Sequence, residues 1–115
     1  MIFVIDDDMV MARCVADATG KRAKVFSNAI EAMDKIASGA MPSLIFLDIL
    51  LDGPDGFTFL NELVTYSDTG RIPIVIISSL EIKEDGLFRY GVVGVLNKDT
   101  MKPEDIRRYV VRYAG

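Results

Sequence analysis

The chain has 115 residues, a net charge of −4 and a sequence pI near 4.7. This length suits one domain with a single core, and we expect residues 1–115 to form it. The acidic balance argues against direct binding to nucleic acid or to acidic membranes, since both require a basic face. No run approaches the ~18 apolar residues of a membrane span, and no signal peptide is evident, so we expect a cytoplasmic location.

The residue types present limit the chemistry. The chain contains no histidine and one cysteine, which removes the commonest general base, the serine-type triad and the usual zinc sites. Any chemistry must therefore use carboxylates, hydroxyls and lysine. Cys14 cannot form an internal disulfide, and its apolar neighbours in the sequence predict a small buried side chain rather than a reactive thiol.

Five short apolar runs alternate with five longer stretches of helical periodicity, a pattern that predicts a βαβ architecture with a parallel sheet. The expected strands cover residues 2–5, 24–26, 44–47, 74–77 and 92–96. The expected helices cover residues 9–18, 28–39, 57–70, 81–90 and 103–113. The helix over 81–90 has the weakest pattern because it contains Gly86 and a cluster of charges.

The helical period also predicts which side chains face the core. Asn28, with Glu31 three residues later, resembles a capping box that opens the second helix. The predicted inward residues are Ile30, Met33, Ile36 and Ala37 in the second helix, Phe57, Leu60, Leu63 and Val64 in the third, and Ile106, Tyr109, Val110 and Tyr113 in the last.

Polar residues able to handle phosphate or metal follow four of the five expected strands. They are Asp6 and Asp7, Asp48, Ser78 and Lys98. The apolar run 44–47 stops abruptly at Asp48, as a strand buried on both faces would stop at the rim of a sheet. In a parallel sheet of order 2-1-3-4-5, these four strands are neighbours, and their carboxyl ends converge on one crevice.

Each of these residues also has an ordinary structural interpretation. The acidic run Asp6 to Asp8 could cap the helix that follows, and we expect Asp8 to do so. Asp48 and Lys98 could be solvated charges, and Ser78 could belong to a turn. Their joint placement at four adjacent strand ends is what favours a shared site.

Three carboxylates in one crevice need a cation. Two ionised carboxylates ~5 Å apart repel by ~3 kcal/mol at an effective dielectric constant near 20. Oxygen ligands suit Mg²⁺. With that ion bound, Asp48 could attack phosphorus without a general base, while Lys98 and the Ser78 hydroxyl stabilise the phosphoryl oxygens.

Four segments together resemble the receiver domain of bacterial two-component response regulators. They are residues 4–8, residues 47–48 with Asp55 and Gly56, residues 72–79 and residues 94–98. The resemblance implies a flavodoxin-like (βα)5 three-layer sandwich whose Asp48 accepts a phosphoryl group from the phosphohistidine of a sensor kinase or phosphotransfer protein. It also implies that Asp6, Asp7, Asp48 and the Leu50 carbonyl hold Mg²⁺, that Ser78 and Lys98 assist, and that a downstream protein or fused output domain responds. Catalysis would be limited to the domain's own phosphorylation and dephosphorylation.

Three positions depart from the family pattern, and all three bear on signalling. Asp52 stands where a proline is usual, and Val95 where the fifth strand usually has a switching aromatic residue. Asp99 replaces the proline that usually follows the lysine, often through a cis bond. A cis bond before a residue other than proline costs ~3 kcal/mol, so we expect a trans bond there.

Two alternatives remain open. The departures suit a receiver-like interaction module that works without phosphorylation. A haloacid-dehalogenase-like phosphohydrolase also uses an aspartate nucleophile and Mg²⁺. Its chemistry needs a second acid two residues later, where this chain has Leu50, and this argues against it.

Overall fold

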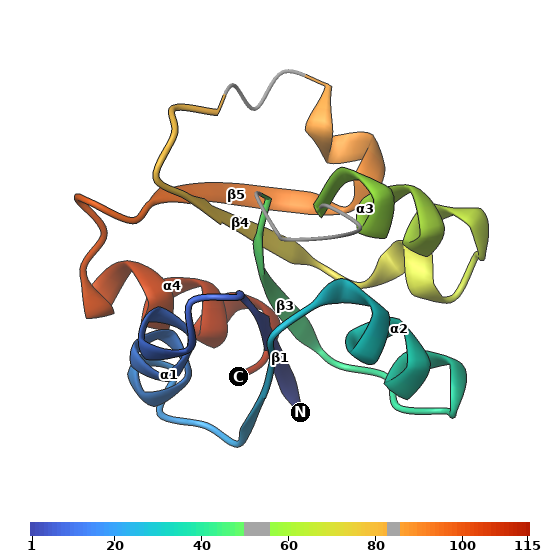
Figure 1. Ribbon diagram of the computed structural model, residues 1–115, viewed down its shortest axis with the longest axis horizontal. Helices are drawn as coiled ribbons and strands as arrows, with labels where there is room; N and C mark the ends of the chain where they lie inside the picture. Colours follow the sequence, from blue (N-terminus) through green and yellow to red (C-terminus); the bar gives the residue numbers. More distant parts are fainter. Residues whose placement is uncertain (50–55, 83–85) are drawn as a thin grey trace.

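Five parallel strands form one twisted sheet at the centre of the protein (Figure 1). A computed structural model describes residues 1–49, 56–82 and 86–115. The strands are β1 (Ile2–Ile5), β2 (Ala23–Phe26), β3 (Leu44–Asp48), β4 (Ile74–Ser78) and β5 (Val92–Asn97). Their order is β2-β1-β3-β4-β5, and every neighbouring pair is parallel. The predicted α/β fold and strand order are confirmed.

Helices cover both faces of the sheet and make three layers (Figure 1). The α-helices are α1 (Met9–Ala18), α2 (Ala29–Ala37), α3 (Gly56–Thr65) and α4 (Pro103–Tyr113), and the 3₁₀ helices are η1 (Thr69–Arg71) and η2 (Leu87–Tyr90). One core cluster joins the sheet to α1 and α4, and a second joins it to α2 and α3. Successive residues of β3 alternate between the two clusters. A strand covered on both faces therefore reads as a continuous apolar run.

The expected helix over residues 81–90 is wrong. Residues 81 and 82 are not helical, residues 83–85 lie outside the described part of the chain, and the rest forms the 3₁₀ helix η2. Gly86 and Gly91 flank η2 with φ angles of 76° and 84°. Left-handed backbone at both ends cannot continue an α-helix, so η2 stays short.

The predicted core faces of α2 and α3 are correct in part, since Ile36, Leu60 and Leu63 are buried as expected. In α2, Ile30 is 54% exposed, while Ala29 and Ala32 are buried. In α3, Phe57 is 44% exposed and Phe59 is buried. Small alanines let α2 pack closely on the sheet, and a stripe chosen by side-chain size misses that arrangement. Ala37 is also exposed.

Other local predictions are confirmed, with one exception. The Asn28 side chain accepts the Glu31 N–H at 2.9 Å and so caps α2. In α4, Ile106 and Val110 are buried, and Tyr109 and Tyr113 pack against the same core. The exception is Cys14, which is exposed. The buried residues of α1 are Ala12, Val15 and Ala16, and Cys14 falls outside that stripe.

Candidate functional site

The carboxyl ends of four neighbouring strands bring the predicted site residues together. Asp6 follows β1, Asp48 ends β3, Ser78 ends β4 and Lys98 follows β5. Strand register aligns these ends: Ile5 lies opposite Leu47, and Asp48 lies opposite Ile77. Ser78 in turn lies opposite Asn97. Among the described residues, five polar side chains are buried, and three of them are Asp6, Asp48 and Ser78.

Lys98 bridges two of the carboxylates. Its Nζ lies 2.9 Å from Oδ2 of Asp6 and 3.1 Å from Oδ2 of Asp48. All three side chains are shielded from solvent, with 14% of the Lys98 side chain exposed. Charged groups that are close and shielded interact much more strongly than surface pairs. The ammonium therefore holds β1, β3 and β5 together through their charged ends.

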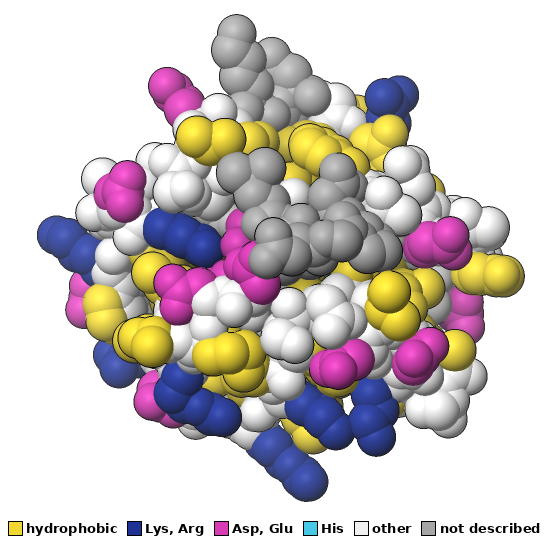
Figure 2. Space-filling view, in the orientation of Figure 1, with side chains coloured by type: hydrophobic (Ala, Val, Ile, Leu, Met, Phe, Trp, Pro, Cys, Tyr) yellow, Lys and Arg dark blue, Asp and Glu magenta, His cyan; other side chains and the backbone are white. Residues whose placement is uncertain are grey.

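A third carboxylate completes an acidic group. One oxygen each from Asp6, Asp7 and Asp48 lies within 4.8 Å of the others, and Asp7 is exposed. Acidic side chains gather over the ends of β1 and β3 in Figure 2, beside a basic side chain.

Asp8 has a different role, because it caps α1 by accepting the Val10 and Met11 N–H groups. The prediction for Asp8 is confirmed. Leu50, proposed as a carbonyl ligand, lies outside the described residues.

Burial and neighbouring charges shift the pKa values of Asp6 and Lys98. Burial raises the pKa of Asp6 to about 6, and the nearby charge of Asp48 adds to that rise. A hydrogen bond from the Asp8 N–H and the contact with Lys98 oppose it. Burial acts to lower the pKa of Lys98, but its hydrogen bonds and charge interactions with Asp6 and Asp48 raise it on balance. Lys98 is therefore charged at neutral pH.

Ser78 is the last residue of β4 and carries a buried hydroxyl group. The side chain is fully buried, and its Oγ accepts the Leu80 N–H at 3.0 Å. An oxygen that accepts in this way still has its own proton to donate. Ser78 lies on the strand next to that of Asp48, in the position expected from sequence.

Residues 2–111 match the family description "Response regulator receiver domain". The chain belongs to this family. Receiver domains are signalling domains of two-component systems, not classical enzymes, and the family interacts with histidine kinases and output domains. Within the described residues, no helix combines the length and apolar character needed to span a membrane.

Individual relatives agree with this assignment. The receiver domain is 33% identical over 87 residues to the response regulator PleD of Caulobacter vibrioides, covering 73% of this chain and 19% of PleD. It thus spans about a fifth of that protein. The receiver domain of NtrX from Brucella abortus is 26% identical, with a TM-score of 0.79 and coverage of 98% and 97%. Vibrio cholerae CheY4 shares the fold at a TM-score of 0.82 and 21% identity, with coverage of 97% and 96%.

Two of the family departures can be located in the receiver domain. Val95 is partly buried against the α2 and α3 side of the core. The described residues contain no cis peptide bond, so Lys98 and Asp99 are joined by the expected trans bond. Asp52, the third departure, lies outside the described residues.

Two features were not predicted from the sequence. Asn97 accepts hydrogen bonds that shape the turn around Lys98, and only its short polar side chain hinted at this.

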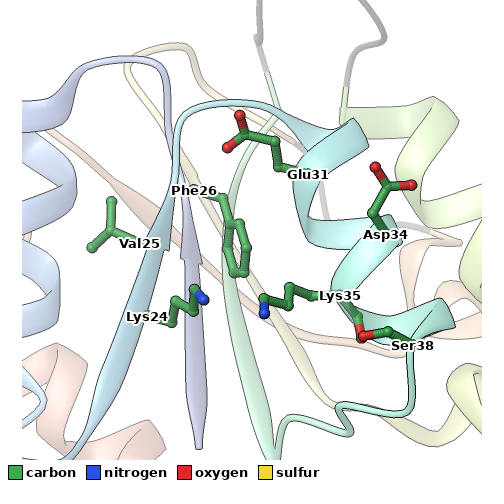
Figure 3. A pocket seen from close by; sticks show the side chains of 7 residues that line it. All are labelled: Lys24, Val25, Phe26, Glu31, Asp34, Lys35 and Ser38. Carbon is green, nitrogen blue, oxygen red and sulfur yellow. The ribbon is translucent and has the colours of Figure 1, made fainter.

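A hollow of about 450 Å³ lies between β2 and α2, and none of the predicted site residues lines it. Figure 3 shows Lys24 and Lys35 pointing toward one another in it, and the charge of Lys35 lowers the pKa of Lys24.

Proposed function

We propose that Asp48 accepts a phosphoryl group from the phosphohistidine of a sensor kinase or phosphotransfer protein. The observation that carries this proposal is the Lys98 ammonium, which contacts Asp6 and Asp48 at 2.9 and 3.1 Å. A cation placed there offsets the charge that a phosphoryl group would bring to an acidic pocket. The chemistry matches that of the family to which the chain belongs.

The acidic group fits a hard divalent cation. Three carboxylate oxygens lie within 4.8 Å of one another, and oxygen is the ligand that Mg²⁺ prefers. Asp6, Asp7 and Asp48 would hold the ion, with the Leu50 carbonyl as a further proposed ligand. When bound, Mg²⁺ neutralises negative charge on the phosphoryl oxygens and on the carboxylates.

The transfer itself needs little from the protein beyond placement and charge. An oxygen of Asp48 forms a bond to phosphorus while the bond from phosphorus to the donor's imidazole nitrogen breaks, and that nitrogen keeps the electron pair. Asp48 enters as a carboxylate, so no general base is required. Lys98 stabilises the charge on the transferring group, and the Ser78 hydroxyl donates a hydrogen bond to it. Loss of the phosphoryl group to water returns the domain to its starting state.

Phosphorylation would act as a switch. The phosphoryl oxygens draw the Ser78 hydroxyl and the following loop inward, which shifts the population of the surface formed by η2, β5 and α4 toward a partner-binding state. A downstream protein or a fused output domain would read that surface. Because Val95 replaces the usual aromatic residue, the signal cannot pass through a rotating ring at this position.

A second candidate is an interaction module that keeps the fold and works without phosphorylation. Asp52, Val95 and Asp99 motivate it, since all three stand at positions where the family pattern differs and which bear on signalling. A partner whose affinity for the receiver domain changes on phosphorylation would exclude this candidate.

The proposal is tested by treating the receiver domain with Mg²⁺ and acetyl phosphate and weighing the intact protein. We expect one added phosphoryl group on the wild type and none on Asp48→Asn. Asp17→Asn, which changes an exposed acid on α1, serves as the matched control and should be modified like the wild type. No adduct on the wild type, or an equal adduct on Asp48→Asn, contradicts the proposal.

A further inference from the structure

We propose that Asn97 is a positioning residue that holds Lys98 against Asp6 and Asp48. Asn97 is the last residue of β5 and directly precedes Lys98. Its side-chain Oδ1 accepts the Asp99 N–H at 2.8 Å, and its backbone carbonyl accepts the N–H groups of Thr100 and Met101 at 3.2 and 2.8 Å. One residue therefore receives three hydrogen bonds from the turn that carries Lys98.

These bonds fix the backbone of Lys98 from both sides. On the N-terminal side, the Lys98 N–H donates to the Ser78 carbonyl at 2.9 Å, which continues the pairing of β4 with β5. On the C-terminal side, the next peptide N–H, that of Asp99, is tied to the Asn97 side chain. With both flanking peptides held, the direction of the Lys98 side chain toward the carboxylates is set by the backbone.

The chain needs such a device because Asp99 stands where the family usually has proline. Proline stiffens a turn by fixing its own φ angle. Asp99 does not fix its own φ angle, so the backbone at this residue would adopt several conformations without another constraint. An asparagine side-chain oxygen that accepts the N–H of the residue two positions later closes an Asx turn. Asn97 thus supplies, through a side-chain hydrogen bond, the rigidity that this position lacks.

The backbone of Lys98 must be held because a lysine side chain is flexible and does not by itself fix the position of its ammonium group. Its side chain has several rotatable bonds and loses conformational entropy when it is ordered. The contacts with Asp6 and Asp48 offset that cost only if the ammonium arrives at the correct place. A shift of the turn would lengthen both contacts together.

Two variants isolate the Asn97 side chain. Asn97→Ala removes the acceptor of the Asp99 N–H, whereas Asn97→Ser keeps a neutral oxygen that accepts the same kind of bond more weakly. Asn28→Ala is the matched control. Asn28 also accepts a backbone N–H, at 2.9 Å, but does so at the start of α2 and from Glu31, which is not a proposed site residue.

The first measurement does not depend on phosphorylation. An amine-acetylating reagent is applied to the native protein, and the acetylation rate of Lys98 is read by peptide mass spectrometry. We expect Asn97→Ala to raise that rate severalfold, Asn97→Ser to return it toward the wild-type value, and Asn28→Ala to leave it unchanged. An unchanged rate in Asn97→Ala overturns the inference, even if the wild type takes up no phosphoryl group and the proposed function fails.

The second measurement rests on the proposed function and asks whether Asn97 acts through Lys98. We expect Asn97→Ala to slow phosphorylation by acetyl phosphate about tenfold, since an ångström of misplacement costs that much or more. In a Lys98→Ala background, the same change should cost less than about twofold, because the group it positions is gone. An equal loss in both backgrounds would overturn the inference by showing that Asn97 acts by another route.

Discussion

Among single residues of the site, Asp6 shows how burial and neighbouring groups act on one carboxylate. It is buried, it receives the Asp8 N–H on one oxygen and the Lys98 ammonium on the other, and it still has a pKa raised to about 6. The Lys98 ammonium, shared with Asp48, does not fully offset the burial of Asp6. A divalent cation would supply the missing charge.

The raised pKa of Asp6 predicts a particular pH dependence of stability in the metal-free protein. The folded state keeps the Asp6 proton up to a pH of about 6, while the unfolded chain loses it near its ordinary value of 3.8. Between these values the unfolded state binds fewer protons, so this group makes the free energy of unfolding fall as pH rises. Asp6→Asn removes the effect.

The measurement is urea unfolding of both proteins from pH 4 to pH 7 with a metal chelator present. The stability of Asp6→Asn relative to the wild type should increase over that range by about 2 kcal/mol, because one unit of pKa corresponds to about 1.4 kcal/mol. A difference that stays flat with pH would show that Asp6 titrates normally in the folded protein.

At the scale of elements, two glycines let helices approach the sheet. A Cβ at Gly56 would lie 2.7 Å from Cα of Ile49 and 3.0 Å from the Asp48 carbonyl oxygen. A Cβ at Gly94 would instead meet the Tyr109 side chain of α4. Backbone at the end of β3 and directly after it cannot move aside as an aromatic side chain can. The start of α3 is thereby fixed directly behind Asp48.

These contacts predict unequal costs for two similar substitutions. We expect Gly94→Ala to lower the free energy of unfolding by about 1–2 kcal/mol, typical of overpacking. Gly56→Ala should cost more, about 3 kcal/mol, because the backbone of Asp48 and Ile49 must move. Urea unfolding measures both. Combining Gly94→Ala with Tyr109→Ala should cost less than the sum of the two single changes, since the clash is then absent. Equal costs at the two glycines would contradict this account.

The strands could be predicted from sequence more completely than the helices. Strands buried on both faces form continuous apolar runs, so their positions, and the polar residues after them, were readable. The core face of α2 was predicted only in part, because Ile36 is buried as expected but Ala29 and Ala32 also face the core while the larger Ile30 is exposed. In the segment 81–90, the described residues form only the 3₁₀ helix η2, because Gly86 and Gly91 adopt left-handed backbone. Neither fact follows from helical periodicity.

Across the whole molecule, the site exists only because the sheet order makes the ends of β1, β3, β4 and β5 neighbours. The carboxylates and Lys98 come from segments up to 92 residues apart, from Asp6 to Lys98, and no local segment contains the site. The identity of the proposed site residues was therefore predictable from sequence once the sheet order was inferred. The turn geometry of Asn97 was not, because side-chain hydrogen bonds leave no periodic pattern.

A cation that binds the folded protein should stabilise the whole domain. A ligand present at about 100 times its dissociation constant adds about 2.7 kcal/mol if it binds only the folded state. We therefore expect millimolar Mg²⁺ to raise the melting temperature at pH 7, relative to a sodium salt of equal ionic strength. Asp7→Asn should reduce the shift, and Asp17→Asn should keep it. A shift that is the same in all three proteins would indicate a general salt effect.

The central claim is that Asp48 becomes covalently phosphorylated, and trapping the product at its residue tests this most directly. Borohydride reduces an aspartyl phosphate to homoserine, which peptide mass spectrometry can assign to one position. After treatment with Mg²⁺ and acetyl phosphate, we predict homoserine at position 48 of the wild type, strongly diminished when Mg²⁺ is omitted. Homoserine at another aspartate, or at none, would contradict the account.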